Sequence, residues 1–168
     1  PAHTFMPMAS EPVLVLDRSA AGRVLCSPSR RRGIAYVISI GAPGEPAAAG
    51  FTHIPRRLRL TFEDTDDGGP TGPMPSDIER LITFGRSVDL SSSRLLVHCE
   101  SGISRSSAAA LIVLVVSKGA NDASTAAKLV LAARPQARPN RRMLCLADSH
   151  LGLPGTLHSA ALAHFTYT

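Results

Sequence analysis

The chain has 168 residues, of which 44% are hydrophobic and 18% are charged, and its net charge is +5. This length predicts one domain with a single buried core. The longest apolar run, Ala108 to Val116, is too short to cross a bilayer, which argues against a membrane-spanning protein.

We assign residues 8–168 to one domain and expect residues 1–7 to be a flexible or extraneous N-terminal segment. The first residues lack a charged head followed by a long apolar stretch, so we expect no secretory signal. Three cysteines at unpaired spacings, Cys26, Cys99 and Cys145, argue against a disulfide framework and against a zinc site. This cysteine usage favours a reducing, cytoplasmic location.

The basic residues gather in three clusters, Arg30–Arg32, Arg56–Arg59 and Arg134–Arg142. Such clusters are typical of a solvated surface, of a nucleic-acid partner or of a site for an anionic, phosphorylated substrate. No aromatic residues alternate with these arginines, which argues against a stacking platform for single strands. We therefore expect no nucleic-acid partner.

The predicted strands, in chain order, cover residues 12–17, 34–41, 57–62 and 94–99. The stretch "DTDDGGPTGPMP" follows the third of them and is rich in Gly, Pro and Asp, which predicts a loop. This loop is long for a plain connection, and loops of that length are often functional.

A helix is predicted to begin at Ser76, with Glu79 completing a capping box. Residues 105–119 predict an apolar, covered helix that ends at Gly119. Further helices are expected over 121–134 and 139–152, and the tail after Pro154 is either a last helix or loose. Because strands and helices interleave, we expect a single-domain α/β fold with a central, mostly parallel sheet of about four to five strands and helices on both faces.

The stretch "HCESGISRS" joins the fourth predicted strand to the apolar helix. A loop in this position directs backbone N–H groups and a helix N-terminus at one spot, which binds anions. Gly102 allows the positive φ that such a turn demands. Arg105 can donate two hydrogen bonds to a tetrahedral oxyanion. The residues predicted to bind substrate are Glu100, Ser101, Gly102, Ile103, Ser104, Arg105 and Ser106.

Cys99 lies at the base of this loop, where the N–H groups and Arg105 favour a thiolate. A thiolate below a bound phosphate is placed to attack phosphorus and form a cysteinyl-phosphate, which water then cleaves. Ser106 can donate a hydrogen bond to the sulfur when it leaves, and Ser104 can steady the loop. For His98 we favour a satisfied, buried histidine that orients the cysteine backbone over a group that transfers a proton directly. No metal or cofactor is expected.

Release of the leaving oxygen requires a proton, so a general acid is expected on a separate segment. The stretch "EDTDDGG" supplies three candidates, Asp64, Asp66 and Asp67, and the residues themselves leave the choice open. The two remaining cysteines are predicted to lie in the core. Cys26 would end a strand, and Cys145 would lie in a helix between two leucines.

With these motifs, the chain resembles the cysteine-based protein tyrosine phosphatase superfamily, most of all its dual-specificity branch and a family of small bacterial tyrosine phosphatase-like proteins. The resemblance covers about residues 36–152 and includes "LRLTFEDTDD" and "ARPNRRMLCLADSHLG". It implies that Cys99 is the nucleophile and Arg105 the phosphate ligand, and it favours Asp64 as the acid over Asp66 and Asp67. The five residues between Cys99 and Arg105 exceed the shorter loop of rhodanese-like sulfurtransferases.

The resemblance implies a phosphoric monoester hydrolase that acts on phosphorylated protein or peptide, with phosphoserine and phosphothreonine as possible further substrates. Two alternatives remain open. One is a binding module that holds phosphorylated partners without turnover. The other is a phosphatase of phosphoinositides or of small phosphorylated metabolites.

Overall fold

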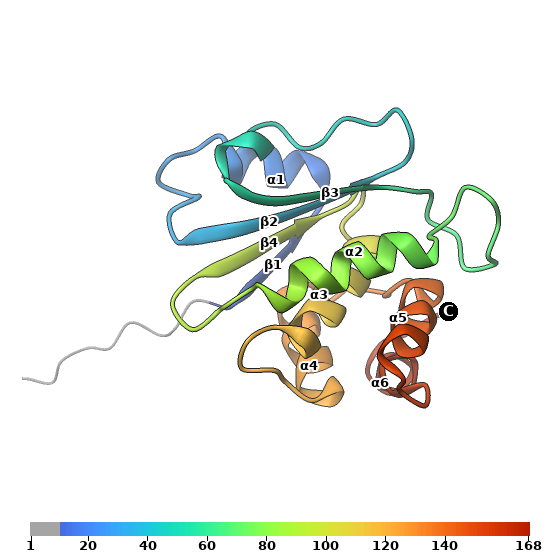
Figure 1. Cartoon of the computed structure of the whole chain (residues 1–168). Coiled ribbons are helices and arrows are strands. Elements are labelled where there is room, and N and C mark those ends of the chain that lie inside the picture. Colours follow the sequence, from blue (N-terminus) through green and yellow to red (C-terminus); the bar gives the residue numbers. More distant parts are fainter. Residues whose placement is uncertain (1–10) are drawn as a thin grey trace, which may run out of the picture.

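The computed structural model describes residues 11–168, so the expectation for residues 1–7 lies outside the described residues. Four parallel strands form one sheet in the order β1-β4-β2-β3 (Figure 1). The strands are β1 (Val13–Leu16), β2 (Ile34–Gly41), β3 (Arg56–Thr61) and β4 (Arg94–His98). The predicted α/β class and parallel sheet are confirmed, whereas the exact limits of the domain stay a prediction.

The helix α3 (Arg105–Val116) forms the centre of the larger core. Every residue from Arg105 to Leu114 is buried, as expected for a helix that is apolar on nearly all sides. The helices α2 (Pro75–Arg86), α4 (Ala123–Ala133) and α5 (Arg141–Leu151) pack around it. The tail after Pro154 forms α6 (Thr156–His164), which packs on α4 and α5.

The opposite face of the sheet is covered by α1 (Arg18–Leu25) and the short 3₁₀ helix η1 (Phe51–His53) (Figure 1). A second, smaller core lies here, in which Leu25 packs with residues of β2 and β4. The expectation of helices on both faces is therefore confirmed. The two faces are covered unequally, because five helices share one side.

The edges of the sheet are formed by β1 and β3. β1 is only four residues long, and β3 exposes the side chains of Arg56 and Arg57. Next to them, Arg80 of α2 donates a hydrogen bond of 3.3 Å from Nη2 to the carbonyl oxygen of Arg59. The basic cluster on β3 thus belongs largely to an open edge of the sheet.

Two predictions about the cysteines are wrong. Cys26 does not end a strand but directly follows α1, and the Cys26 side chain is exposed. The N-terminus of α1 is capped by Asp17. Cys145 lies in α5 as expected but is also exposed. Its neighbour Leu144 is buried, yet successive residues of a helix point about 100° apart, so the burial of one says little about the next.

Two predicted helix limits are also wrong. α2 begins at Pro75, which is pre-organised for a first helical position, and the carboxylate of Asp77 accepts from the N–H of Met74 at 2.9 Å. Ser76 and Glu79 therefore do not form the capping box. α3 ends at Val116, before Gly119.

The start of α6 depends on a side chain from another helix. Its own N-cap residue is Gly155, which offers no side-chain acceptor. Instead, Asp148 of α5 accepts hydrogen bonds from the N–H groups of Leu157 (2.8 Å) and His158 (3.1 Å). Asp148 is only 3% exposed, so its two carboxylate oxygens satisfy two helix-end donors inside the protein.

We predict that Asp148→Ala lowers the free energy of unfolding by about 1–3 kcal/mol, because it leaves one buried and one partly buried donor without acceptors. Urea denaturation checks this value. The exposed neighbour Ser149 provides the control, and Ser149→Ala should change the free energy by about 0.5 kcal/mol or less. Equal midpoints for Asp148→Ala and the parent protein would contradict the prediction.

Candidate active site

The carboxyl ends of the four parallel strands meet at one edge of the sheet, where the predicted site residues lie. The binding loop, residues 99–105, joins β4 to α3 as predicted. Gly102 has a φ of +70°, and a Cβ atom on it would lie 2.5 Å from the N atom of Asp17. Only glycine fits this position, because it must both adopt the left-handed conformation and pass close to the end of β1.

The carbonyl groups at the start of the binding loop are held by two arginines. Arg134 donates from Nε to the carbonyl oxygen of Gly102 and from Nη2 to that of Ser101, both at 3.1 Å. Arg18 donates its backbone N–H to the carbonyl oxygen of Glu100 at 3.2 Å, and its guanidinium pairs with the Glu100 carboxylate at 2.9 Å. These bonds fix the first half of the loop from outside.

The second half of the loop is held by the segment before α5. The N–H of Arg138 donates to the carbonyl oxygen of Ile103 at 2.9 Å, and that of Asn140 donates to Ser104 at 3.0 Å. The N–H and C=O groups of one peptide unit point in opposite directions. Because the carbonyl groups of the loop accept hydrogen bonds from the surrounding segments, the amide groups of the loop point toward its interior. Within residues 11–168, the amides of residues 100–104 donate to no protein acceptor. The loop therefore forms a nest of donors suited to an anion.

Cys99 and Arg105 lie at opposite ends of this loop, and both are buried. The Cys99 side chain is 2% exposed, and its Sγ lies 3.1 Å from the Oγ of Ser106. Arg105 is 7% exposed and donates from Nη1 to the carbonyl oxygen of Phe62 at 2.7 Å. Its Nε is buried and has no partner among the described residues. A buried, charged donor without an acceptor is costly unless an anion occupies the loop.

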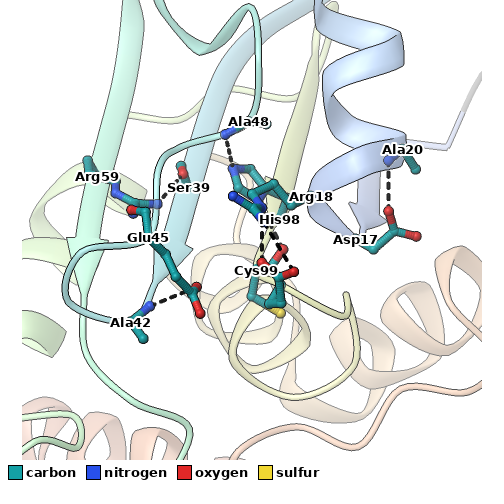
Figure 2. Close-up of polar contacts among 11 residues, drawn as sticks. Asp17, Arg18, Ala20, Ser39, Ala42, Glu45, Ala48, Arg59, His98 and Cys99 are labelled. Carbon is teal, nitrogen blue, oxygen red and sulfur yellow. Dashed lines mark hydrogen bonds and ion pairs between the residues drawn. The ribbon is translucent and has the colours of Figure 1, made fainter.

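His98 is a satisfied, buried histidine, in agreement with the sequence-based reading. Its Nε2 accepts from the N–H of Ala48 at 3.2 Å, so its Nδ1 carries the hydrogen and donates to the carbonyl oxygen of Cys99 at 3.1 Å (Figure 2). Burial lowers the pKa of His98, which favours this neutral form. His98 thereby ties the loop after β2 to the backbone of the cysteine.

The structure separates the three aspartate candidates, which lie on the aspartate loop, residues 62–74. Asp64 accepts from the Ser104 hydroxyl at 2.6 Å, so its carboxylate touches the binding loop. Asp66 instead pairs with Arg141, whose backbone N–H donates to it at 3.1 Å. Asp67 accepts from the N–H of Gly69 and shapes a turn of its own loop. Of these three, only Asp64 contacts the binding loop.

Sequence reasoning missed the residues that hold the site in place. Arg134 appeared only as part of a basic cluster, and Asn140 only as part of a helix motif. The structure places Arg134 behind the binding loop and Asn140 between that loop and Asp64, to which its Nδ2 donates at 2.8 Å. An arginine just before a proline and an asparagine at a helix start were visible signals. Their partners, however, lie more than 30 residues away in the chain.

No protein-family model matches the chain. Over 112 residues it is 32% identical to dual specificity protein phosphatase 15 of mouse. The matched stretch covers 66% of this chain and 43% of the mouse protein. The chain thus spans less than half the length of this relative.

The fold is also that of solved phosphatase structures. Human DUSP28 superposes with a TM-score of 0.60 at 19% identity, covering 84% of this chain and 92% of DUSP28. PTPMT1, solved in complex with PI(5)P, superposes with a TM-score of 0.56 at 16% identity, covering 92% of this chain and 94% of the other.

The narrower resemblance to a small bacterial group is not tested by these likenesses and stays a prediction. No helix within residues 11–168 combines the length and the apolar character needed to cross a bilayer. The sequence likeness and the shared fold agree with the resemblance based on the binding loop. The chain is thus similar in sequence, over 112 residues, to a dual specificity phosphatase, and it has the fold of the cysteine-based phosphatases.

Proposed function

We propose that the chain is a protein tyrosine phosphatase of dual-specificity type, which hydrolyses phosphomonoesters of phosphorylated proteins or peptides through a cysteinyl-phosphate. The observation that carries this proposal concerns residues 11–168, among which the buried Nε of Arg105 has no partner and the inward amides of the adjacent loop have no protein acceptor. A tetrahedral dianion would satisfy all of these donors together.

In the first step, the Cys99 thiolate attacks phosphorus, so an S–P bond forms as the P–O bond to the leaving group breaks. Asp64 gives its proton to the leaving oxygen. The charge on the equatorial oxygens is stabilised by the loop amides and by Arg105. The contact of Phe62 with Arg105 supports this role, because it fixes the plane of the guanidinium.

In the second step, Asp64 accepts a proton from water as the water oxygen attacks phosphorus and the S–P bond breaks. The thiolate that leaves needs a donor. Ser106 supports this step, because its hydroxyl lies 3.1 Å from Sγ and can point its hydrogen at the sulfur. No metal or cofactor takes part in either step.

The contact between Asp64 and the binding loop favours an enzyme that turns over phosphomonoesters over a module that only binds phosphate. A binding module needs the donors of the loop but no acid, whereas here a carboxylate from another segment touches Ser104 of the binding loop. The pairing of Asp66 with Arg141 also leaves Asp64 as the candidate acid.

A second substrate class is supported by the likeness to PTPMT1, which was solved with PI(5)P. Phosphoinositides would require the same cysteine chemistry but a different surface around the site. The binding loop has no lysine, and its one acidic residue, Glu100, is paired with Arg18. Phosphate release from PI(5)P in mixed micelles, compared with release from a phosphotyrosine peptide at equal concentration, distinguishes the two classes.

We predict that Cys99→Ser lowers turnover of p-nitrophenyl phosphate by about 10³-fold or more, because a hydroxyl cannot replace the thiolate as nucleophile. Steady-state release of p-nitrophenol measures this loss. Cys26→Ser serves as the matched control, since Cys26 is exposed after α1, and it should keep the parental rate. Full activity in Cys99→Ser would rule out the cysteinyl-phosphate mechanism.

We predict that Asp64→Asn lowers kcat by about 10²-fold or more for phenyl phosphate, because the poor leaving group then departs without a proton. An aryl phosphate with an acidic phenol should be affected far less. Asp67→Asn is the control, because Asp67 accepts a hydrogen bond from Gly69 of its own loop, and it should leave both rates near those of the parent. An equal loss for both substrates in Asp64→Asn would speak against its role as the acid.

A further inference from the structure

We propose that Asn140 is a positioning residue for the general acid, which holds Asp64 so that its acidic proton resides on Oδ2. The inference rests on the proposed function, because it takes Asp64 as the acid. It adds a residue that acts through Asp64 rather than on the substrate, and it assigns distinct roles to the two oxygens of the carboxylate.

Asn140 is 2% exposed, and its polar atoms all have partners in different segments. Its Oδ1 accepts from the N–H of Met143 at 2.9 Å and so caps α5. Its Nδ2 donates to Oδ1 of Asp64 at 2.8 Å and to the carbonyl oxygen of Thr65 at 3.1 Å. Its backbone N–H donates to Ser104. One buried residue thus joins α5, the aspartate loop and the binding loop.

The orientation of the Asn140 amide follows from its neighbours. The N–H of Met143 can only donate, so it must face the amide oxygen of Asn140. The amide nitrogen is then forced to face Asp64 and the carbonyl oxygen of Thr65, which are both acceptors. The reversed amide would place two donors together on one side and acceptors together on the other. The helix cap therefore fixes the donor that holds the acid.

The hydrogen bonds to Asp64 are unequally shared between its oxygens. Oδ1 accepts both from the Ser104 hydroxyl at 2.6 Å and from Nδ2 of Asn140 at 2.8 Å, which uses its two lone pairs. A proton on the carboxyl group must then be carried by Oδ2. When the Oδ2–H bond breaks and the proton passes to the leaving oxygen, the negative charge that remains on Asp64 is stabilised by the two donors on Oδ1.

This positioning role is separable from helix capping. Serine caps helices about as well as asparagine, because either side chain can accept from an N–H of the first turn. Only a side chain with both an acceptor and an amide donor can cap α5 and also reach Asp64 and Thr65. Asn140→Ser should therefore keep the cap and lose the contact with the acid.

The test measures kcat and KM for a series of aryl phosphates whose leaving phenols have pKa values from about 5 to about 10. For Asn140→Ser we expect kcat to fall by about 10- to 100-fold with the poorest leaving group, and by less than about threefold with the best, at unchanged KM. Asn140→Asp keeps the cap but places a second carboxylate against Asp64. This variant should make kcat depend still more steeply on the pKa of the leaving phenol. The matched control is Asp122→Ala, which removes the N-cap of α4. It should lower the Tm and leave the leaving-group dependence unchanged.

A double-mutant cycle completes the test. If Asn140 acts through Asp64, Asn140→Ser should cost less than about threefold in kcat when added to Asp64→Asn. A loss that is uniform across leaving groups, or a loss that adds fully to that of Asp64→Asn, would overturn the inference while the parent enzyme remained a phosphatase. A parent protein that turns over none of the aryl phosphates would overturn the proposed function, and the inference with it.

Discussion

The binding loop depends on a single constraint: its carbonyl groups must be held outward so that its amides can point inward. The ladders of β4 and α3 do not supply this constraint, because residues 99–104 lie between the two elements. The hydrogen bonds come instead from the start of α1, from Arg134 and from the segment before α5. A loop without these partners could rotate its peptide units and turn carbonyl oxygens toward a bound anion. The inward orientation of the loop amides is therefore a property of the segments around the loop.

The parallel sheet explains why these segments can meet. All four strands end at the same edge, so the cap of α1, the loop after β2, the aspartate loop and the binding loop emerge side by side (Figure 1). His98 and Asn140 then act as bridges between them. His98 connects the loop after β2 to the cysteine backbone, and Asn140 connects α5 to both Asp64 and Ser104. Each bridge is a buried polar side chain whose partners are satisfied, which specifies one arrangement of the loops rather than several.

The sequence was informative wherever a local pattern carried the signal. The strand, small-residue turn and apolar helix around Cys99 predicted both the binding loop and the central helix. Several misses share a cause, since they depend on a neighbour that is distant in the chain. In the short helix α1 the large apolar residues are Val24 and Leu25, which directly precede Cys26 and resemble the end of a strand, whereas the helix is stabilised by burial of Leu25 against the sheet. The choice among Asp64, Asp66 and Asp67 depended on Ser104, Asn140 and Arg141, which no periodicity of the aspartate loop could reveal.

The open edges of the sheet have a consequence for the behaviour of the protein in concentrated solution. An edge strand offers unpaired backbone groups to any other extended chain, and proteins block such edges with charge or keep them short. Here one border has only four residues, and the other presents Arg56 and Arg57, while Arg80 occupies the carbonyl oxygen of Arg59. Two copies that approached through this border would bring like charges together before any ladder could form. Part of the basic character of the chain thus guards against sheet-to-sheet association, independently of any phosphate that the molecule binds.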